Sequence, residues 1–358
     1  MSVTSTSVTG EGLRPNKGFH PFLEGEGPSP YLFVDACMQG WRDADYANAH
    51  RHGVAAYGVT AFLPHVTLDV ALEDLMFWHL VARKYPNTRV AFTVDDIRNA
   101  YRDGKTTFLL ASQDGGFIDR QLHRLEAFYR LGLRMLIPAY NAANNICAGC
   151  LDHPNLGLTR FGELVVDECN RLGLLLDGSH VGKRSTLEIM ARSSQPIVFS
   201  HSNVRALADS ARNVDDEQIK ACAASGGVIG VANFGPFTKK AGSKEWPTMT
   251  DMIEHVDYIA ELTGTTDHIG IGTDMSLGTY PDHKHDPWGE PAYLNPSDDY
   301  GTVVSGDVRS PMRALRDFNS YPQVLDFADR LLGHGYKDSD VRNILGENFL
   351  RVFAQVWK

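Results

Sequence analysis

Short runs of continuous apolar residues alternate with amphipathic segments along most of the chain. Such runs are typical of parallel strands buried on both faces, and apolar residues at helical spacing, such as Leu122, Leu125 and Phe128, indicate helices. The pattern predicts strands at 31–34, 55–62, 107–112, 133–137, 172–177, 196–199, 228–232 and 268–273, with an accessory strand at 90–93. It predicts helices at 43–52, 69–84, 95–102, 118–131, 160–171, 215–224, 249–263, 321–333 and 339–356, with a short one between the strands at 172–177 and 196–199. Strands and helices that alternate in this way predict an α/β fold, a closed (β/α)8 TIM barrel.

The ends of the chain and one internal segment depart from this alternation. Residues 1–30 are rich in Ser, Thr, Gly and Pro, and we expect them to form an N-terminal arm. Residues 31–358 are expected to form a single barrel domain with helices at its C-terminal end. Residues 279–311 are rich in Pro and Gly and follow the last strand, so a long loop that lines an active site is expected there. This loop contains His283 and His285.

Composition narrows the class of protein. The chain has 358 residues and a formal net charge of −10, from 34 Lys and Arg against 44 Asp and Glu. This balance gives no reason to expect nucleic acid or an anionic membrane as a partner. The first residues lack the basic and apolar regions of a signal peptide, and five cysteines are too few and odd in number for a disulfide framework. We therefore expect a cytoplasmic protein with reduced thiols.

Two histidines follow adjacent predicted strands. The apolar runs 172–177 and 196–199 each lead into a Ser-His pair, which ends in His180 and His201. The carboxyl ends of barrel strands meet at one mouth, where such folds place their active sites. Two neutral imidazoles at that mouth can share a divalent metal ion. Alternatively, these histidines only form hydrogen bonds to loops.

Other side chains that could take part in catalysis or metal binding occupy the same predicted strand ends. Asp274 follows the last strand and could bind metal or transfer protons, or it could be a salt-bridged carboxylate. Cys37 could be a nucleophile, a ligand or a packed thiol. Tyr140 and Asn141 follow the fourth strand, and Asn141 could hydrogen-bond a polar substrate, although Asn is also a common loop former. The remaining strand-end residues are Gln39, Pro64, His65, Gln113, Asp114 and Asn233.

A CxxC motif, Cys147 to Cys150, lies in the same loop as Asn141. A structural zinc site usually needs a second pair of ligands, which the sequence does not offer, and a redox pair usually opens a helix in a different fold. We interpret these two residues as ordinary thiols that could line the pocket.

Four segments resemble the membrane (renal) dipeptidase family: FSHSNVRALADSARNVDDEQIKACAASGGVIGV, DGSHVGKRSTLEI, HIGIGTDM and ILGENFLRVF. The resemblance extends over about residues 31–354 and implies a metal-dependent hydrolase barrel that cleaves dipeptides with two zinc ions. It implies that His180 and His201 bind one zinc, and that Asp274 is the last-strand aspartate of the metal centre. It also implies that Arg212 holds the carboxylate of the substrate, as suits a guanidinium fork. A homodimer is implied by the resemblance alone.

The departures from the family pattern concern the other zinc ion. The family's His-x-Asp pair on the first strand is replaced by Cys37 and Gln39, and its bridging glutamate aligns with Gln113, or with Asp114 after a one-residue shift. The family's histidine after the fourth strand aligns with Tyr140. A dinuclear site needs anionic oxygens to offset four positive charges, which neutral amides do not supply. We therefore expect one zinc ion and regard the second site as doubtful.

These observations predict a hydrolase that cleaves a small carboxylate-bearing dipeptide-like, amide or imine substrate. In this prediction His180 and His201 hold the metal, with Gln113, Asp274 or Cys37 as a further ligand. Arg212, Asn141 and Gln113 contact substrate, and Asp274, Cys37 and Tyr140 are candidate catalytic groups. The alternatives are a metal-free lyase or isomerase that uses Cys37 or Tyr140, and a barrel that only binds a small molecule.

Overall fold

The computed structural model describes residues 31–152, 156–279 and 313–358. The predicted N-terminal arm therefore lies outside the described residues. So does nearly all of the predicted loop 279–311, including His283 and His285. None of the described helices is long and apolar enough to cross a membrane.

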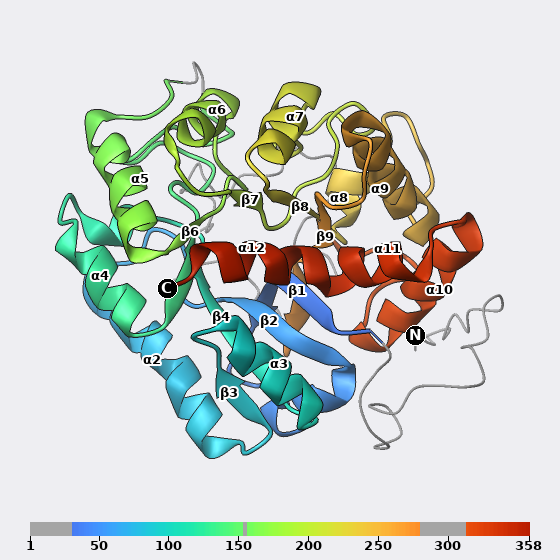
Figure 1. The fold of residues 1–358 in the computed structure, drawn as a ribbon, viewed down its shortest axis with the longest axis horizontal. Coiled ribbons are helices and arrows are strands. Elements are labelled where there is room, and N and C mark those ends of the chain that lie inside the picture. The colour runs from blue at the N-terminus through green and yellow to red at the C-terminus, as the bar shows by residue number, and fades with distance from the viewer. Residues whose placement is uncertain (1–30, 153–155, 280–312) are drawn as a thin grey trace, which may run out of the picture.

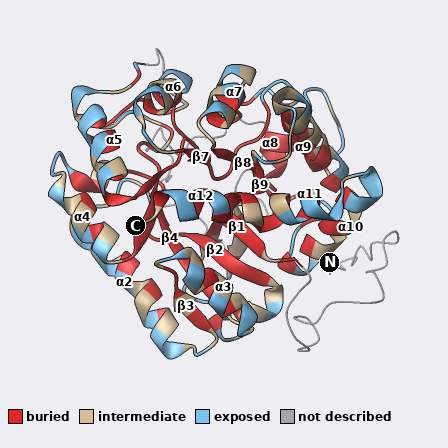
Figure 2. Cartoon of the chain, viewed as in Figure 1, coloured by how far each residue is buried: buried red, intermediate tan, exposed pale blue. Residues whose placement is uncertain are grey.

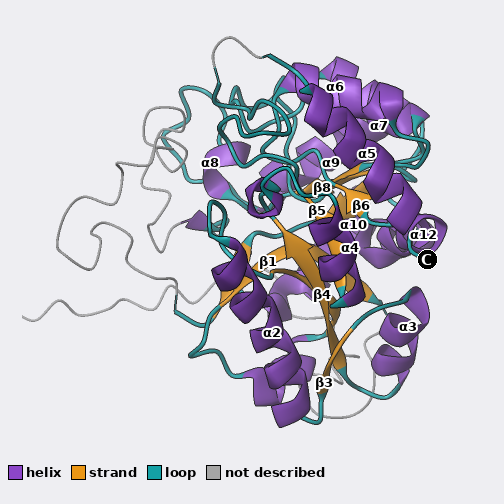
Figure 3. Ribbon diagram, turned by 90° about the vertical axis from the view of Figure 1, so that its left-hand side faces the viewer, coloured by secondary structure: helices purple, strands orange, loops and turns teal. Residues whose placement is uncertain are grey.

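The centre of the protein is a ring of parallel strands surrounded by helices (Figures 1 and 3). Neighbouring strands pair in the order β1, β2, β4, β5, β6 in one sheet and β7, β8, β9 in another. The two sheets are joined by a parallel bridge between Asp177 and Val198 and by a hydrogen bond from Asp274 N to Cys37 O of 2.8 Å. The predicted (β/α)8 barrel is confirmed. Its wall consists of β1 (Phe33–Gly40), β2 (Val54–Thr60), β4 (Thr106–Ser112), β5 (Leu133–Leu136), β6 (Leu175–Leu176), β7 (Val198–Phe199), β8 (Val228–Val231) and β9 (Ile269–Ile271).

Two further strands belong to the larger sheet. β3 (Thr88–Val90) pairs with β4 and is the predicted accessory strand, two or three residues earlier than expected. β10 (Met275–Leu277) pairs in parallel with β1 and was not predicted, because three residues are too few for a recognisable pattern.

The helices follow the predicted order and cover the outside of the ring. Their ends carry local signals: Thr159 Oγ1 accepts a hydrogen bond from Gly162 N at the start of α5, and Gly173 ends that helix with a left-handed φ of 85°. The described α-helices are α2 (Leu68–Lys84), α3 (Val94–Arg102), α4 (His123–Arg130), α5 (Arg160–Leu172), α6 (Lys183–Arg192), α7 (Asp216–Ala224), α8 (Gly235–Thr238), α9 (Met249–Thr263), α10 (Val324–His334), α11 (Asp338–Arg342) and α12 (Asn348–Val356). Short 3₁₀ turns occur at Tyr46–His52, Gly116–Ile118 and Tyr321–Gln323.

Some boundaries differ from the prediction. The first strand was predicted to end at Val34, but β1 continues to Gly40, so Cys37 and Gln39 lie on the strand. Pairing with both β2 and β10 stabilises this polar part of β1. The helix predicted at 339–356 is divided by a π-helical turn at Asn343–Glu347, and the segment predicted as a helix at 43–52 is mainly a 3₁₀ turn.

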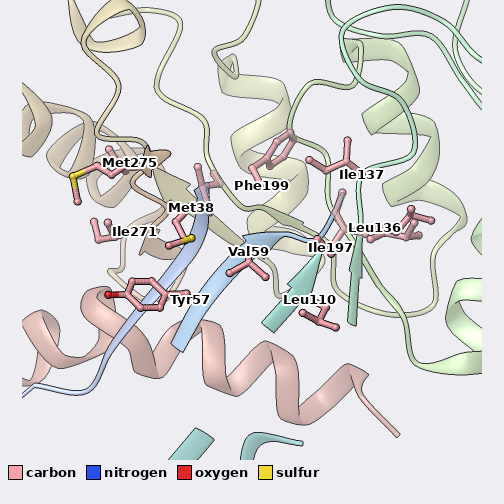
Figure 4. Close-up of a cluster of buried hydrophobic side chains, with 14 of the residues drawn as sticks. Met38, Tyr57, Val59, Leu110, Leu136, Ile137, Ile197, Phe199, Ile271 and Met275 are labelled. Carbon is pink, nitrogen blue, oxygen red and sulfur yellow. The ribbon is translucent and has the colours of Figure 1, made fainter. Parts of the chain in front are cut away.

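Successive residues in the middle of several strands belong to two different clusters of the core, as the period of two in a strand predicts. Tyr57, Val59 and Leu110 point into the layer between strands and helices, whereas Ala56 and Leu109 belong to the inside of the barrel. The outer layer, part of which Figure 4 shows, also contains Met38, Leu136, Ile137, Ile197, Phe199, Ile271 and Met275. Burial is therefore highest on the strands and on the inward faces of the helices (Figure 2).

The C-terminal helix α12 closes the inside of the barrel at one end and crosses the strands there (Figure 1). Phe349 and Phe353 of α12 pack with Val34 and Val228, which lie near the starts of β1 and β8. The approach is close: a Cβ atom on Gly270 would lie 2.3 Å from Phe349 Cε2. Because α12 fills the end at which the strands begin, the opposite end, where they finish, is left for a functional site.

A buried carboxyl group, Asp35 on β1, provides a test of this core. Its Oδ1 accepts hydrogen bonds from the backbone amides of Thr273 and Cys37, and its Oδ2 accepts from the hydroxyls of Thr273 and Tyr321. Burial raises the pKa of Asp35 from its ordinary value of 3.8 to about 7, although the hydrogen bonds oppose this shift. The folded protein thus binds this proton more tightly than the unfolded chain does.

The free energy of unfolding of Asp35→Asn, relative to that of the wild type, is therefore expected to increase as the pH rises from about 4 to about 7. The raised pKa stabilises the wild type fully below the pKa that Asp35 has in the unfolded chain, and this stabilisation is lost as the pH rises through the pKa in the folded protein. Each unit of difference between the two pKa values corresponds to about 1.4 kcal/mol. The amide can present its oxygen to the two N–H groups and its NH2 to the two hydroxyls.

The measurement is urea unfolding of both proteins at pH 5 and pH 8, with Asp119→Asn, which changes an exposed carboxylate, as the control. The difference in unfolding free energy between variant and wild type is compared at the two pH values, because other groups also titrate in this range. An equal difference in unfolding free energy at both pH values would contradict the raised pKa.

Candidate active site

Four non-glycine residues in the turns after strands adopt left-handed backbone conformations. They are His65 (φ 62°), Asn141 (φ 59°), His180 (φ 65°) and Asp274 (φ 54°). Residues held in such sparsely populated regions cluster at functional sites, because the surrounding structure must stabilise them. All four lie at the carboxyl ends of barrel strands, so the backbone geometry indicates the same site as the sequence pattern.

The structure brings His180 and His201 into direct contact. Their Nε2 atoms are 2.9 Å apart, and both side chains are buried. Each ring is held from behind: His180 Nδ1 is 2.7 Å from Asn141 Oδ1, and His201 Nδ1 is 2.7 Å from Ser200 Oγ. The two imidazoles therefore present their Nε2 atoms to one point from fixed directions.

A buried carboxylate, Asp177, connects the two loops that carry the histidines. Its Oδ1 accepts hydrogen bonds from the backbone amides of Ser179, at 2.9 Å, and Ser200, at 3.0 Å. Ser179 and Ser200 immediately precede His180 and His201. Asp177 thus fixes the spacing of the histidine pair from beneath.

Burial lowers the pKa of both histidines well below the ordinary value, and the positive charge of Arg212 lowers it further. The imidazoles are therefore neutral at physiological pH, which is the form that binds metal. Asn141 Oδ1 also accepts from Cys150 Sγ, so it acts as an acceptor toward His180 Nδ1–H. This tautomer leaves the lone pair of His180 Nε2 directed at His201.

The geometry of the pair fits a metal ion. Two nitrogens at about 2.0–2.1 Å from a tetrahedral zinc lie roughly 3.3 Å apart, so a small opening of the 2.9 Å contact would admit the ion. Metal-binding histidines are usually oriented by a hydrogen bond to the second ring nitrogen, as Asn141 orients His180 and Ser200 orients His201. However, among the described residues no group of three or more His, Cys, Asp or Glu side chains is placed to hold an ion. Two histidines alone would bind zinc more weakly than the usual three protein ligands.

Tyr140 lies against the histidine pair. Its ring stacks on that of His180 with centroids 4.0 Å apart and an angle of 26°, and it meets the ring of His65 edge-on at 6.0 Å. The ring limits the movement of His180 and covers one side of it. The predicted catalytic role of its hydroxyl stays a prediction.

Asp274 is held by donors on both sides of its carboxylate. Gln39 Nε2 donates to Oδ1 at 3.0 Å, and the guanidinium of Arg313 lies 3.5 Å from Oδ2. Arg313 also donates to the backbone oxygen of Asp274 at 2.9 Å. The carboxylate is therefore fixed near the mouth of the barrel with a cation beside it.

Cys37 and Gln113 contact each other inside the mouth. Gln113 Nε2 lies 3.3 Å from Cys37 Sγ and donates to Thr60 Oγ1 at 2.9 Å. Burial raises the pKa of Cys37 well above the ordinary thiol value, and the negative charges of Asp274 and Asp35 raise it further. Cys37 is thus a neutral thiol in this environment, which disfavours the predicted role as a nucleophile.

Arg212 is buried beside the histidines. Its guanidinium donates to the backbone oxygen of His201 at 3.3 Å and lies 5.1 Å from the centre of the Phe237 ring. Together with His180 it lines a cavity of about 190 Å³, whose other charged lining residues are Lys183 and Arg205, each paired with carboxylates, and Asp152. The cavity is smaller than the roughly 300–1,000 Å³ of most ligand pockets. It therefore suits a small anionic group.

Two further predictions concern the loop after β5. Asn141 is fully buried, and its contacts with His180 and Cys150 favour an orienting role over the predicted contact with substrate. The two thiols of the CxxC motif are free, as are the other cysteines. Cys150 lines the cavity, and burial raises its pKa to about 11, so it is also a neutral thiol.

The sequence did not indicate every residue of this site. Arg313 was missed because it lies beyond the long loop, where no pattern connects it with Asp274. Ser200 and Asp177 were visible only as parts of the two strand–Ser-His segments, and their orienting roles depend on hydrogen bonds across the loops.

Comparisons with known proteins agree with this fold. The sequence profile described as membrane dipeptidase (peptidase family M19) matches residues 36–287. Dipeptidase 3 of Mus musculus is 26% identical, in an alignment that covers 94% of this chain and 64% of the mouse protein. This chain thus spans less than two thirds of that relative.

Solved structures show the same fold. A crystal structure of an amidohydrolase from Pseudomonas aeruginosa superimposes with a TM-score of 0.80 at 26% identity, over 96% of this chain and 99% of that one. A metallopeptidase from Rhodobacter sphaeroides, crystallised with a phosphinate mimic of the dipeptide L-Ala-D-Ala, gives 0.67 at 22% identity, over 83% of this chain and 78% of that one. From the profile match and the shared barrel, we conclude that the chain belongs to the membrane dipeptidase family of metal-dependent hydrolases.

Proposed function

We propose that the protein hydrolyses small dipeptide-like amides that carry a free carboxylate, and that it does so with a single metal ion held by His180 and His201. The observation that carries the proposal is the histidine pair, with the Nε2 atoms 2.9 Å apart and a hydrogen-bond partner behind each ring. Membership of a metallopeptidase family supports the reaction class.

Arg212 is proposed to bind the carboxylate of the substrate. Its guanidinium lines the cavity next to His180 and is buried, whereas the other cations of the lining, Lys183 and Arg205, are paired with surface carboxylates. A guanidinium meets a carboxylate through two parallel N–H donors, which fixes orientation as well as charge. A carboxylate bound there would lie beside His180, with the rest of a small substrate at the barrel mouth.

Asp274 is proposed to transfer the proton. The donors from Gln39 and Arg313 hold its carboxylate in place at the barrel mouth. A positioned carboxylate can accept the proton of the attacking water and return it to the leaving amine. The metal, when bound, lowers the pKa of water and polarises the scissile carbonyl. The neutral thiol of Cys37 is not required in this scheme.

The second zinc ion of the family does not fit this chain. Where the resemblance calls for anionic ligands, Gln39 and Gln113 donate hydrogen bonds through their amides. The alternative to Gln113, Asp114, accepts hydrogen bonds from Asn144 Nδ2 and the backbone amide of His65. Neutral donors cannot offset the charge of a second divalent ion.

The proposal is tested by assaying the protein on a small panel of dipeptides and N-acyl amino acids, as purified, after EDTA treatment, and after readdition of zinc. We expect turnover that is lost with the chelator and restored by zinc. Thermal stabilisation by a dipeptide without turnover in the zinc-loaded protein would instead indicate a binding protein. Turnover that persists after complete removal of metal would favour the metal-free alternative. The homodimer and the cytoplasmic location stay predictions from the sequence.

A further inference from the structure

We infer that Arg313 takes the place of a second metal ion, as the fixed cation that holds Asp274 in position. The inference deepens the proposed function, because it concerns the same site and assigns a role to a residue of this chain that lies outside the recognised motifs. Arg313 is a positioning residue in this account and acts through Asp274.

The contacts of Asp274 support this role. Arg313 donates to the backbone oxygen of Asp274 at 2.9 Å, and the same nitrogen lies 3.5 Å from the carboxylate Oδ2. Both side chains are almost completely withdrawn from solvent, with 11% and 12% of their surface exposed. A carboxylate withdrawn from solvent is stabilised by a nearby positive charge and by hydrogen-bond donors. Arg313 supplies the charge, and Gln39 supplies a donor to the other oxygen.

Arg313 is held firmly by the residues that follow it. Asn233, at the end of β8, accepts from the backbone amide of Leu315 at 3.1 Å and donates to the backbone oxygen of Phe318 at 2.7 Å. Trp246 Nε1 donates to the backbone oxygen of Ala314 at 2.7 Å. The guanidinium also lies 5.4 Å from the centre of the Phe234 ring. These contacts place the cation precisely on a rigid part of the barrel.

The neighbouring side chains match a protein cation better than a metal ion. A guanidinium needs one carboxylate and has its own donors, whereas a divalent ion needs several acceptors. Beside Asp274 the chain places neutral amides, and both Gln39 and Gln113 use their Nε2 groups as donors. Neutral amides at positions 39 and 113 and the guanidinium of Arg313 therefore belong to one arrangement of charge around Asp274.

The experiment compares the metal content of two variants in which the ligand residues of the family have been restored at three positions. The variant Cys37→His, Gln39→Asp, Gln113→Glu is made with Arg313 intact and with Arg313→Gln, and zinc per chain is counted by mass spectrometry after equilibration. With Arg313 intact we expect the wild-type count, and with Arg313→Gln we expect one additional ion. An equal count in the two proteins would overturn the inference, whatever the activity of either.

A second measurement uses the single variants and does not depend on the rebuilt site. Arg313→Gln is expected to lower kcat by about 10- to 100-fold, the usual loss for a charge-assisted hydrogen bond, with little change in KM and no change in zinc content. Arg313→Lys should restore part of kcat, because it keeps the charge. Arg316→Gln, which removes an exposed partner of Glu245 in the same segment, should leave activity unchanged.

Equal kcat for wild type and Arg313→Gln, or no recovery with lysine in a protein that unfolds at the wild-type temperature, would overturn the positioning role. If the wild type hydrolyses none of the dipeptides, the proposed function fails. The difference in zinc content between the two rebuilt variants then still decides the role of Arg313.

Discussion

Arg212→Met is expected to lower kcat/KM for a dipeptide by about 10²–10³-fold. Truncating one partner of a buried, hydrogen-bonded charge pair costs about 2–5 kcal/mol, and each 1.4 kcal/mol is a factor of ten. Arg212 is 2% exposed and lines the cavity beside His180, so solvent would screen its interaction with a carboxylate only weakly. Arg212→Lys keeps the charge but loses the planar fork, so an intermediate loss is expected.

The comparison of two substrates isolates this interaction from damage to the fold. A dipeptide and its C-terminal amide are assayed with the wild type, with Arg212→Met, and with Arg184→Met, which changes an exposed arginine paired with Glu188. The wild type and the control should prefer the free carboxylate strongly, and Arg212→Met should lose most of that preference. If the ratio of kcat/KM for the two substrates were the same in all three proteins, Arg212 would not bind the carboxylate.

His180→Ala and His201→Ala are each expected to abolish zinc-dependent turnover and to remove the stabilisation of the protein by zinc. A ligand that binds only the folded state stabilises it by about 2.7 kcal/mol at a concentration of one hundred times Kd. Each variant leaves a single imidazole, which cannot hold the ion in the proposed geometry. Because the pair already lacks a third ligand of the usual kind among the described residues, the loss of either ring should lower affinity severely.

The measurement is thermal unfolding at increasing zinc concentration. His334→Ala, which changes an exposed histidine paired with Asp257, is the matched control and should respond to zinc as the wild type does. A zinc-dependent rise in melting temperature that is equal in wild type and both site variants would assign the metal to another place on the protein.

The fold could be predicted because its signals are local. The run 228–232 and the helix patterns at 69–84 and 249–263 each carry their own periodicity, and these elements appear within one residue of the predicted boundaries. The order of strands and helices then leaves the barrel as the simplest way to bury every strand. β10 and the polar half of β1 were missed, because their stability comes from pairing with distant segments.

The candidate site could be predicted in part for the same reason. His180 and His201 follow recognisable strands, so the prediction that they lie together depends only on the fold, and the 2.9 Å contact agrees with it. The state of Cys37 depends on its burial, on Asp35 two residues before it, and on Asp274, which only the barrel brings near it. The pairing of Asp274 with Arg313, 39 residues later, is a property of the folded chain alone.

The central claim is that one metal ion binds at the histidine pair, and its most direct test is the metal content of the purified protein. Zinc per chain is counted by mass spectrometry for the wild type, His180→Ala and His201→Ala, after expression with added zinc and removal of free ions. The account predicts close to one ion in the wild type and none in either variant. Two ions in the wild type, or one ion that persists in both variants, would contradict it.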